Sequence, residues 1–249
     1  MDGKGKIAFV SGANRGIGLE TVRGLGELGV TVLLGARSLT NGEKAAGELR
    51  RQGISSVETI EFDVREQAHH RRVASLLDKR AGLDILVNNA AIELEGADFG
   101  APFNDTSTVS ESVLRRTFDV NFFAVVSLTQ TLLPLLRRSP AGRIVNLSSI
   151  LGSLTLHSDP ASRIYHVKSF AYDASKTALN AFTVHLAAEL RDTSIKVNSA
   201  HPGWVKTELG GPSAAMDLDQ GGRTSVQLAM LPADGPTGGY FHLGEPLPW

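Results

Sequence analysis

Six short runs rich in β-forming residues recur along the chain, and segments of helix length separate them. The separating segments carry apolar residues at three- and four-residue spacing, which predicts helices. Strands that alternate with helices form parallel sheets covered by helices. The pattern therefore predicts an α/β fold, a single doubly wound (Rossmann-like) domain with a mostly parallel sheet flanked by helices. We expect strands at 6–10, 31–36, 57–62, 84–88, 142–148 and 195–200, and helices within 16–28, 41–52, 66–80, 110–137 and 172–191.

The chain has 249 residues, of which 42% are hydrophobic, and this is enough for a sizeable core. No Pro/Gly/Ser-rich linker, internal repeat or low-complexity tract divides it. We therefore expect one domain over 1–249. A nucleotide-binding half would cover about 1–140, and a catalytic and substrate half about 141–249.

Composition argues against several classes of function. The 25 basic and 26 acidic side chains nearly cancel, so nucleic acid is not an expected partner. The absence of cysteine rules out disulfides, thiolate metal sites and a cysteine nucleophile. No apolar run approaches the roughly 20 residues needed to cross a bilayer, so we expect no membrane partner and a cytoplasmic location. No metal site is expected, because metal-ligand spacing is missing around the histidines we considered, His69, His70, His157 and His166.

The first predicted strand runs directly into the glycine-rich sequence SGANRGIG at 11–18. A strand, a tight turn and a helix N-terminus together direct backbone N–H groups at a pyrophosphate. The spacing GxxxGxG differs from the dinucleotide fingerprint GxGxxG, so a tight turn without a ligand is an alternative. The position after the first strand favours a dinucleotide. The expected contacts are Gly12, Asn14, Arg15, Gly16, Ile17 and Gly18.

The second predicted strand ends in Gly35-Ala36-Arg37-Ser38, where an acid would bind the ribose 2′-hydroxyl of NAD. No acid is present. Arg37 and Arg15 can instead clamp a 2′-phosphate, which favours NADPH/NADP+ as the cofactor, with Ser38 beside it. The alternative is that each arginine is an ordinary solvated charge.

Tyr172 and Lys176 lie four positions apart within AYDASKTALNAF and therefore on one face of the predicted helix. A phenol has a pKa of about 10, and a neighbouring ammonium lowers it toward the range of a useful proton relay. Tyr165 lacks such a partner, because Ser169 lies four positions on. A buried ring and a surface cation are the alternative interpretation of the pair.

Further motifs follow along the chain: NNAA at 88–91, Asn121 in VNFFA, NLSS at 146–149, YDASK at 172–176 and HPGWVKT at 201–207. Together with the glycine loop they resemble the short-chain dehydrogenase/reductase family over nearly the whole chain. The C-terminal third is similar to the carbonyl reductase branch. Ser11 and Ala91 depart from the commoner Thr and Gly at their positions.

The resemblance implies four catalytic roles. Ser149 hydrogen-bonds the substrate carbonyl, with Ser148 as a lesser candidate. Tyr172 supplies the proton, Lys176 lowers the pKa of Tyr172 and binds the nicotinamide ribose, and Asn121 helps to hold a proton-relay water. Two hydroxyl donors aimed at the carbonyl oxygen suit the negative charge that develops there.

The resemblance also implies further cofactor contacts. Asp63, followed by Val64, matches the adenine contact, although a helix N-cap is an alternative role. Asn89 and Ala90 line the adenosine side through backbone atoms. Pro202 and Gly203 lie beside the nicotinamide. In the following lid segment, Val205 and Thr207, with Trp204, are candidates near cofactor or substrate or are lid packing.

The implied activity is reversible, NADPH-dependent reduction of ketones or aldehydes, with a small-molecule carbonyl substrate. Two alternatives remain, a reductase dedicated to one secondary-metabolite ketone and an NADPH-binding sensor or scaffold without turnover. The stretch between Ser149 and Tyr172 is longer than in many relatives, and we expect an extra loop or short helix there at the mouth of the site. Residues 92–109 are expected to form one wall of the substrate pocket. Monomer and homo-oligomer both stay open.

Overall fold

The computed structural model describes residues 2–80, 82–95 and 105–249. Its centre is one sheet with strand order β3-β2-β1-β4-β5-β6-β7-β8. Every neighbouring pair is parallel except β7 and β8, so the predicted mostly parallel sheet is confirmed. The strands are β1 (Ile7–Val10), β2 (Thr31–Ala36), β3 (Val57–Glu61), β4 (Ile85–Asn88), β5 (Arg143–Leu147), β6 (Lys196–Ala200), β7 (Tyr240–His242) and β8 (Glu245–Pro246).

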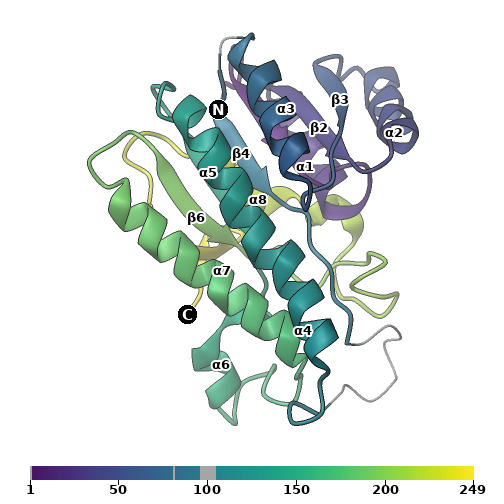
Figure 1. The fold of residues 1–249 in the computed structure, drawn as a ribbon, viewed down its shortest axis with the longest axis vertical. Coiled ribbons are helices and arrows are strands. Elements are labelled where there is room, and N and C mark those ends of the chain that lie inside the picture. Colours follow the sequence, from purple (N-terminus) through teal and green to yellow (C-terminus); the bar gives the residue numbers. More distant parts are fainter. Residues whose placement is uncertain (1, 81, 96–104) are drawn as a thin grey trace.

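Helices connect the strands and cover both faces of the sheet (Figure 1). Ser38 and Ser110 are the N-cap residues directly before α2 and α4. Each hydroxyl accepts a hydrogen bond from an N–H group of the first turn that has no partner within the helix. The α-helices are α1 (Gly16–Glu27), α2 (Leu39–Arg51), α3 (Gln67–Asp78), α4 (Glu111–Phe118), α5 (Ala124–Leu136), α6 (Leu154–Ser158), α7 (Phe170–Glu189) and α8 (Arg223–Ala229). Shorter helical pieces are η1 (Asp119–Phe123), η2 (Ile150–Gly152) and η3 (Leu218–Gln220).

The strands send alternate side chains into two apolar layers, because successive residues of a strand point to opposite faces. Ala8 and Val10 join one layer with α1, α2 and α8, whereas Phe9 joins the other with α3, α5 and α7. In Figure 1, α3, α5 and α7 cover the near face of the sheet. All three of these strand side chains are fully buried. The doubly wound layering predicted from the sequence is confirmed.

The strand order reverses at β1, which pairs with β2 on one side and β4 on the other. Chain crossovers diverge at this point and leave a crevice beyond the carboxyl ends of the strands. Ser11 continues β1 and donates its N–H to Val87 O at 3.1 Å, and Ser148 continues β5 and donates to Ala200 O at 2.8 Å. The residues that follow β1, β4, β5 and β6 therefore meet at one edge of the sheet.

The helix predicted within 110–137 is present as one helical stretch, Glu111–Leu136. It consists of α4, the π-helical turn η1 and α5 in direct succession. We expected no apolar run that could cross a membrane, but by its length and composition this stretch could do so. Its mean hydropathy is 1.4 over its most apolar window. Half of that window is buried inside the protein. Core helices of soluble proteins meet the same criteria, so the stretch is weak evidence for a membrane span.

The insertion after Ser149 forms η2 and α6, so the expected short helix is present. The helix α7 begins at Phe170, two residues before Tyr172, where the sequence predicted its start. Residues 96–104, half of the expected pocket wall at 92–109, lie outside the described residues.

Candidate functional site at the strand ends

The glycine loop between β1 and α1 has the geometry of an anion cradle. Gly12 and Gly16 have φ of +63° and +58°, a region in which side chains are strained. A Cβ on Gly18 would lie 2.5 Å from Asn89 Nδ2 and 2.7 Å from Gly12 O, so only glycine fits there. Arg15 precedes α1 without a side-chain cap, which leaves N–H groups of the first turn available. The residues present fit a dinucleotide pyrophosphate.

Ser11 and Asn89 brace this loop from below. The Ser11 hydroxyl accepts the backbone N–H groups of Asn89 and Ala90, both at 3.1 Å. Asn89 Nδ2 donates to Ser11 O at 2.8 Å and to Gly12 O at 3.0 Å. Asn89 thus holds the loop with its side chain, a role that the sequence motif did not reveal. The two bonds to Ser11 need only a hydroxyl, which serine supplies as threonine would.

The predicted 2′-phosphate residues lie around the ends of β2 and β3. Arg37 is exposed at the end of β2, and its charge helps to lower the pKa of Asp63. The Ser38 hydroxyl caps α2 by accepting from Asn41 N at 3.3 Å. Arg15 forms an ion pair with Glu208 of the segment after β6. The two arginines are therefore both at this edge, but one of them already has an anionic partner.

Asp63 follows β3 and binds Arg65, whose Nη2 lies 2.8 Å from Asp63 Oδ2. The hydrogen bonds from Arg65 are the main reason why the pKa of Asp63 lies below its usual value. Asp63 does not cap α3, since Glu66 precedes that helix, so the alternative N-cap role was wrong. Val64, the next residue, is buried.

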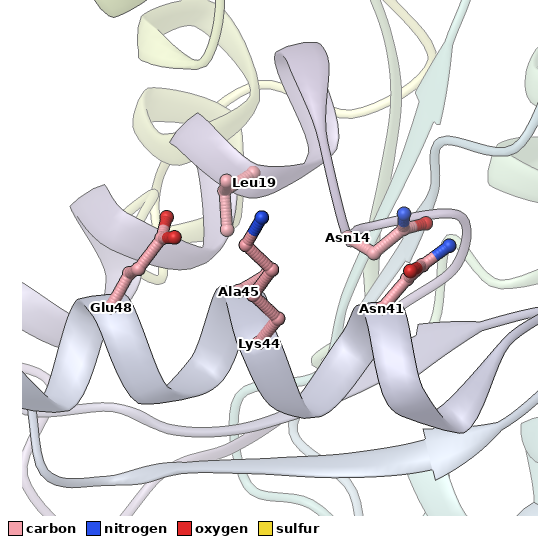
Figure 2. A pocket seen from close by; sticks show the side chains of 6 residues that line it. All are labelled: Asn14, Leu19, Asn41, Lys44, Ala45 and Glu48. Atoms are coloured by element: carbon pink, nitrogen blue, oxygen red, sulfur yellow. The ribbon is translucent and has the colours of Figure 1, made fainter.

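A hollow of about 240 Å³ lies between the glycine loop and α2. Figure 2 shows Asn14 and Asn41 next to each other at one end of the hollow and Glu48 at the other end. Lys44 lies between this asparagine pair and Glu48. Lys44 adds a cation to this side of the loop that no sequence motif indicated. The full lining is Asn14, Leu19, Asn41, Lys44, Ala45 and Glu48.

The segment after β6 folds back onto the glycine loop. Gly203 after Pro202 has φ of +92°, and Val205 is buried and forms a β-bridge with Met216. A Cβ on Gly16 would lie 3.8 Å from Thr207 Cγ2, so Thr207 is beside the loop. Trp204 is 49% exposed, and its Nε1 donates to Gly210 O at 2.8 Å. Val205 and Thr207 thus lie near the predicted cofactor position.

Tyr172 and Ser149 meet at the carboxyl end of β5. Ser149 caps η2 and lies beside the Tyr172 side chain, which is 7% exposed. Burial raises the pKa of the phenol well above its ordinary value, and the nearby Ser149 hydroxyl offsets only part of this rise. Ser148, in contrast, is buried beneath the turn at 2% exposure.

Lys176 lies one turn beyond Tyr172 on α7 and is 2% exposed. Its Nζ lies 5.5 Å from the centroid of the Tyr172 ring and donates to Leu147 O at 2.8 Å. Burial lowers the pKa of the ammonium to about 7. In both groups the loss of hydration dominates, so the pKa of Tyr172 is raised and that of Lys176 lowered, and the role of Lys176 in lowering the pKa of Tyr172 stays a prediction.

Asn121 lies in the π-helical turn η1 and is fully buried. Its Oδ1 accepts from Ile92 N and its Nδ2 donates to Ile92 O, both at 2.8 Å. The same Nδ2 lies 3.0 Å from Ser175 Oγ. Asn121 therefore ties the segment after β4 to α7, beside the tyrosine and the lysine.

Three further polar residues at this edge were missed by sequence reasoning. The carboxylate of Glu95 accepts from Tyr172 N at 3.0 Å. His201 Nδ1 accepts from Ile150 N at 3.1 Å, and burial lowers the pKa of that imidazole to about 3. Burial raises the pKa of Asp173 to about 8. His201 and Asp173 lie within the motifs HPGWVKT and YDASK, but the motifs suggested no role for them, and Glu95 lies outside every motif, so only their tertiary contacts reveal their roles.

Comparison with known proteins agrees with this geometry. The family described as short chain dehydrogenase matches residues 6–217. The chain is 31% identical to salutaridine reductase of Papaver bracteatum over 97% of its length and 96% of the relative, and 32% identical to carbonyl reductase (NADPH) 1 of Homo sapiens over 93% and 94%. The structure of NADPH bound carbonyl reductase from chicken fatty liver superposes with a TM-score of 0.82 at 25% identity, covering 99% of this chain and 100% of that one.

A doubly wound sheet with a glycine cradle at its switch point is an arrangement typical of dinucleotide-binding proteins. The chain belongs to the short-chain dehydrogenase/reductase family and is an oxidoreductase.

Proposed function

We propose that this protein reduces ketones or aldehydes to alcohols with NADPH, using Tyr172 as the proton donor. The observation that carries the proposal is the buried Tyr172 side chain, which lies beside Ser149 and one helical turn from a buried lysine, at the strand edge that also holds the glycine cradle. The resemblance to carbonyl reductases supports the substrate class.

NADPH, when bound, supplies the hydride that adds to the carbonyl carbon. Negative charge then develops on the carbonyl oxygen, and the hydroxyls of Ser149 and Tyr172 are the donors available to stabilise it. Because burial raises the pKa of Tyr172, the phenol keeps its proton at neutral pH and can donate it. Lys176, whose pKa is about 7, is placed to return a proton to the tyrosine.

Two clusters suit the two phosphate-bearing parts of NADPH, the central pyrophosphate and the 2′-phosphate of the adenosine ribose. Backbone N–H groups of the loop around Gly12 and Gly16 would hold the pyrophosphate. Arg37 and Arg15 would hold the 2′-phosphate, for which Arg15 must exchange its partner Glu208. An acid at the end of β2 would bind the unphosphorylated ribose of NADH, but Arg37 and Ser38 stand there instead. Their identity supports NADPH over NADH.

The decisive experiment compares wild type with Tyr172→Phe in NADPH oxidation against ketones, aldehydes, diketones and bulky cyclic ketones. The variant should lose about 10²- to 10⁴-fold in kcat while NADPH binding stays within about twofold. Equal turnover in both proteins would refute the role of Tyr172.

The same panel separates the alternatives. Turnover of many substrates supports a broad carbonyl reductase, whereas turnover of one bulky ketone alone supports a dedicated reductase, an alternative favoured by the similarity to salutaridine reductase. Tight NADPH binding without turnover of any substrate would favour a sensor.

A further inference from the structure

The N-terminus of α7, the helix that carries Tyr172 and Lys176, has no local cap. Ser169 precedes the helix, but its side chain accepts no bond from the first turn. The first N–H groups of an α-helix have no partner within the helix and need one when they are buried. Tyr172 itself is in this first turn, so whatever binds its backbone N–H helps to determine where its side chain points.

Glu95 supplies the missing acceptor from 77 positions away in the sequence. Its Oε2 accepts a hydrogen bond from Tyr172 N at 3.0 Å, and the N–H groups of Ala171 and Phe170 lie near enough to favour the charged carboxylate and lower its pKa. Glu95 is only 7% exposed. Hydrogen bonds from a helix N-terminus to a carboxylate are charge-assisted and among the strong ones.

The backbone that carries Glu95 is itself held in place. Asn121 brackets Ile92 through two 2.8 Å bonds to its N–H and carbonyl. Glu95 N then donates to Glu93 Oε1 at 2.8 Å. Asn121 thus fixes the backbone at Ile92, the chain runs from there to Glu95, and the Glu95 carboxylate binds the backbone of Tyr172.

Further charged groups surround the same turn. Asp173 Oδ2 accepts from Ser169 N at 3.1 Å and lies 3.3 Å from His157 Nε2, whose Nδ1 lies 3.0 Å from Lys168 Nζ. The negative charge of Glu95 helps to raise the pKa of Asp173. Burial raises the pKa of Asp173 to about 8, and burial also raises the pKa of Glu95, but the N–H groups of the first turn of α7 act against the rise at Glu95.

We propose that Glu95 is a positioning residue of the reaction, which fixes the first turn of α7 and thereby aims the Tyr172 hydroxyl at the substrate oxygen. The inference rests on the proposed role of Tyr172. Displacement of a reacting group by about 1 Å can cost on the order of 10²-fold in rate, so a loosened first turn would act on kcat. Cofactor contacts at the glycine loop would be unaffected.

The test measures kcat, the KM for NADPH and the melting temperature of Glu95→Ala and Glu95→Gln. We expect kcat to fall about tenfold or more in Glu95→Ala, with the KM for NADPH within about twofold. Glu95→Gln keeps one oxygen acceptor but loses the charge, so its kcat should be intermediate, about threefold below wild type. A kcat within twofold of wild type in Glu95→Ala, or in Glu95→Gln if the alanine variant does not fold, would overturn the proposal.

Ser110→Ala is the matched control, because it removes the cap of α4, where Ser110 Oγ accepts from Val113 N at 3.3 Å. It should lower the melting temperature and leave kcat within about twofold. An equal loss of kcat there would show that general destabilisation is responsible. If Tyr172→Phe retains wild-type turnover, the proposed function fails, whereas loss in Tyr172→Phe with none in Glu95→Ala refutes Glu95 alone.

Discussion

The cofactor end and the catalytic end of the strand edge are built from different materials. At the cofactor end the glycine loop offers backbone N–H groups, and the charges, Arg15 and Arg37, are exposed on the surface. At the catalytic end Lys176, Asp173 and Glu95 are all buried. An exposed charge keeps its hydration and can bind an anion at little cost to folding, whereas a buried ionisable group opposes folding in its charged form.

This difference predicts that the two ends respond differently to substitution. Changes at the cofactor end should alter cofactor affinity and leave stability nearly unchanged. Changes at the catalytic end should alter stability, and should alter kcat as well where the residue takes part in the reaction.

The largest effect is expected for Lys176→Met, which removes a buried ammonium and should lower kcat by about 10²-fold or more. Stability should rise. The pKa of Lys176 is about 7 in the folded state, against an ordinary value of 10.5. Between pH 7 and pH 10.5 the folded state therefore binds fewer protons than the unfolded state. The stability of the wild type rises with pH across this range. Melting temperatures at pH 6 and pH 9 check this, and the advantage of the variant should be greater at pH 6. A less stable variant at pH 6 would contradict the burial argument.

The next effect is expected for Arg37→Asp, which removes a cation from the 2′-phosphate position and adds repulsion. The KM for NADPH should rise about 10- to 100-fold, and the KM for NADH should not rise. The melting temperature should stay within about 2 °C, because the side chain is exposed. Arg191→Asp, at an exposed site after α7, is the control. Equal changes for both cofactors would show that Arg37 does not recognise the phosphate.

A smaller effect on stability alone is expected for Asp173→Asn. The pKa of Asp173 is raised from 3.8 to about 8, so the folded state retains a proton that the unfolded state loses, and the stability from this group falls as pH rises from 4 to 8. Asparagine does not ionise, so the variant should lose less stability than wild type between pH 5 and pH 8 in urea denaturation. The exposed Asp192→Asn should leave the pH dependence unchanged, and parallel curves for wild type and Asp173→Asn would contradict the prediction.

The smallest effect is expected for Glu208→Gln, which breaks the exposed ion pair with Arg15. Exposed pairs contribute about 0–1 kcal/mol, so the melting temperature should not change measurably. Release of Arg15 should lower the KM for NADPH less than about threefold, and the KM for NADH should stay constant. A large fall in stability would show that the lid segment depends on this pair.

The fold was largely predictable because it depends on local patterns. The predicted runs correspond to β1 to β6, since alternation and apolar periodicity are properties of neighbouring residues. The short strands β7 and β8 were not predicted, because Tyr240–His242 and Glu245–Pro246 are too brief to form a pattern. They gain their places from tertiary pairing, β7 with β6 and β8 with β7. The π-helical turn that carries Asn121 was likewise invisible in the sequence.

By itself, the sequence determined the sheet, the glycine loop at its switch point and the shared helix face of Tyr172 and Lys176, because each follows from spacings of a few residues. Only the tertiary structure decided that Glu95 caps the helix of Tyr172, that Asn89 braces Gly12 and that Arg15 pairs with Glu208. It also decided the directions of the pKa shifts. The reason is physical: capping and hydration depend on which distant segments cover a group, and burial of that kind is set by packing and not by neighbours in the chain.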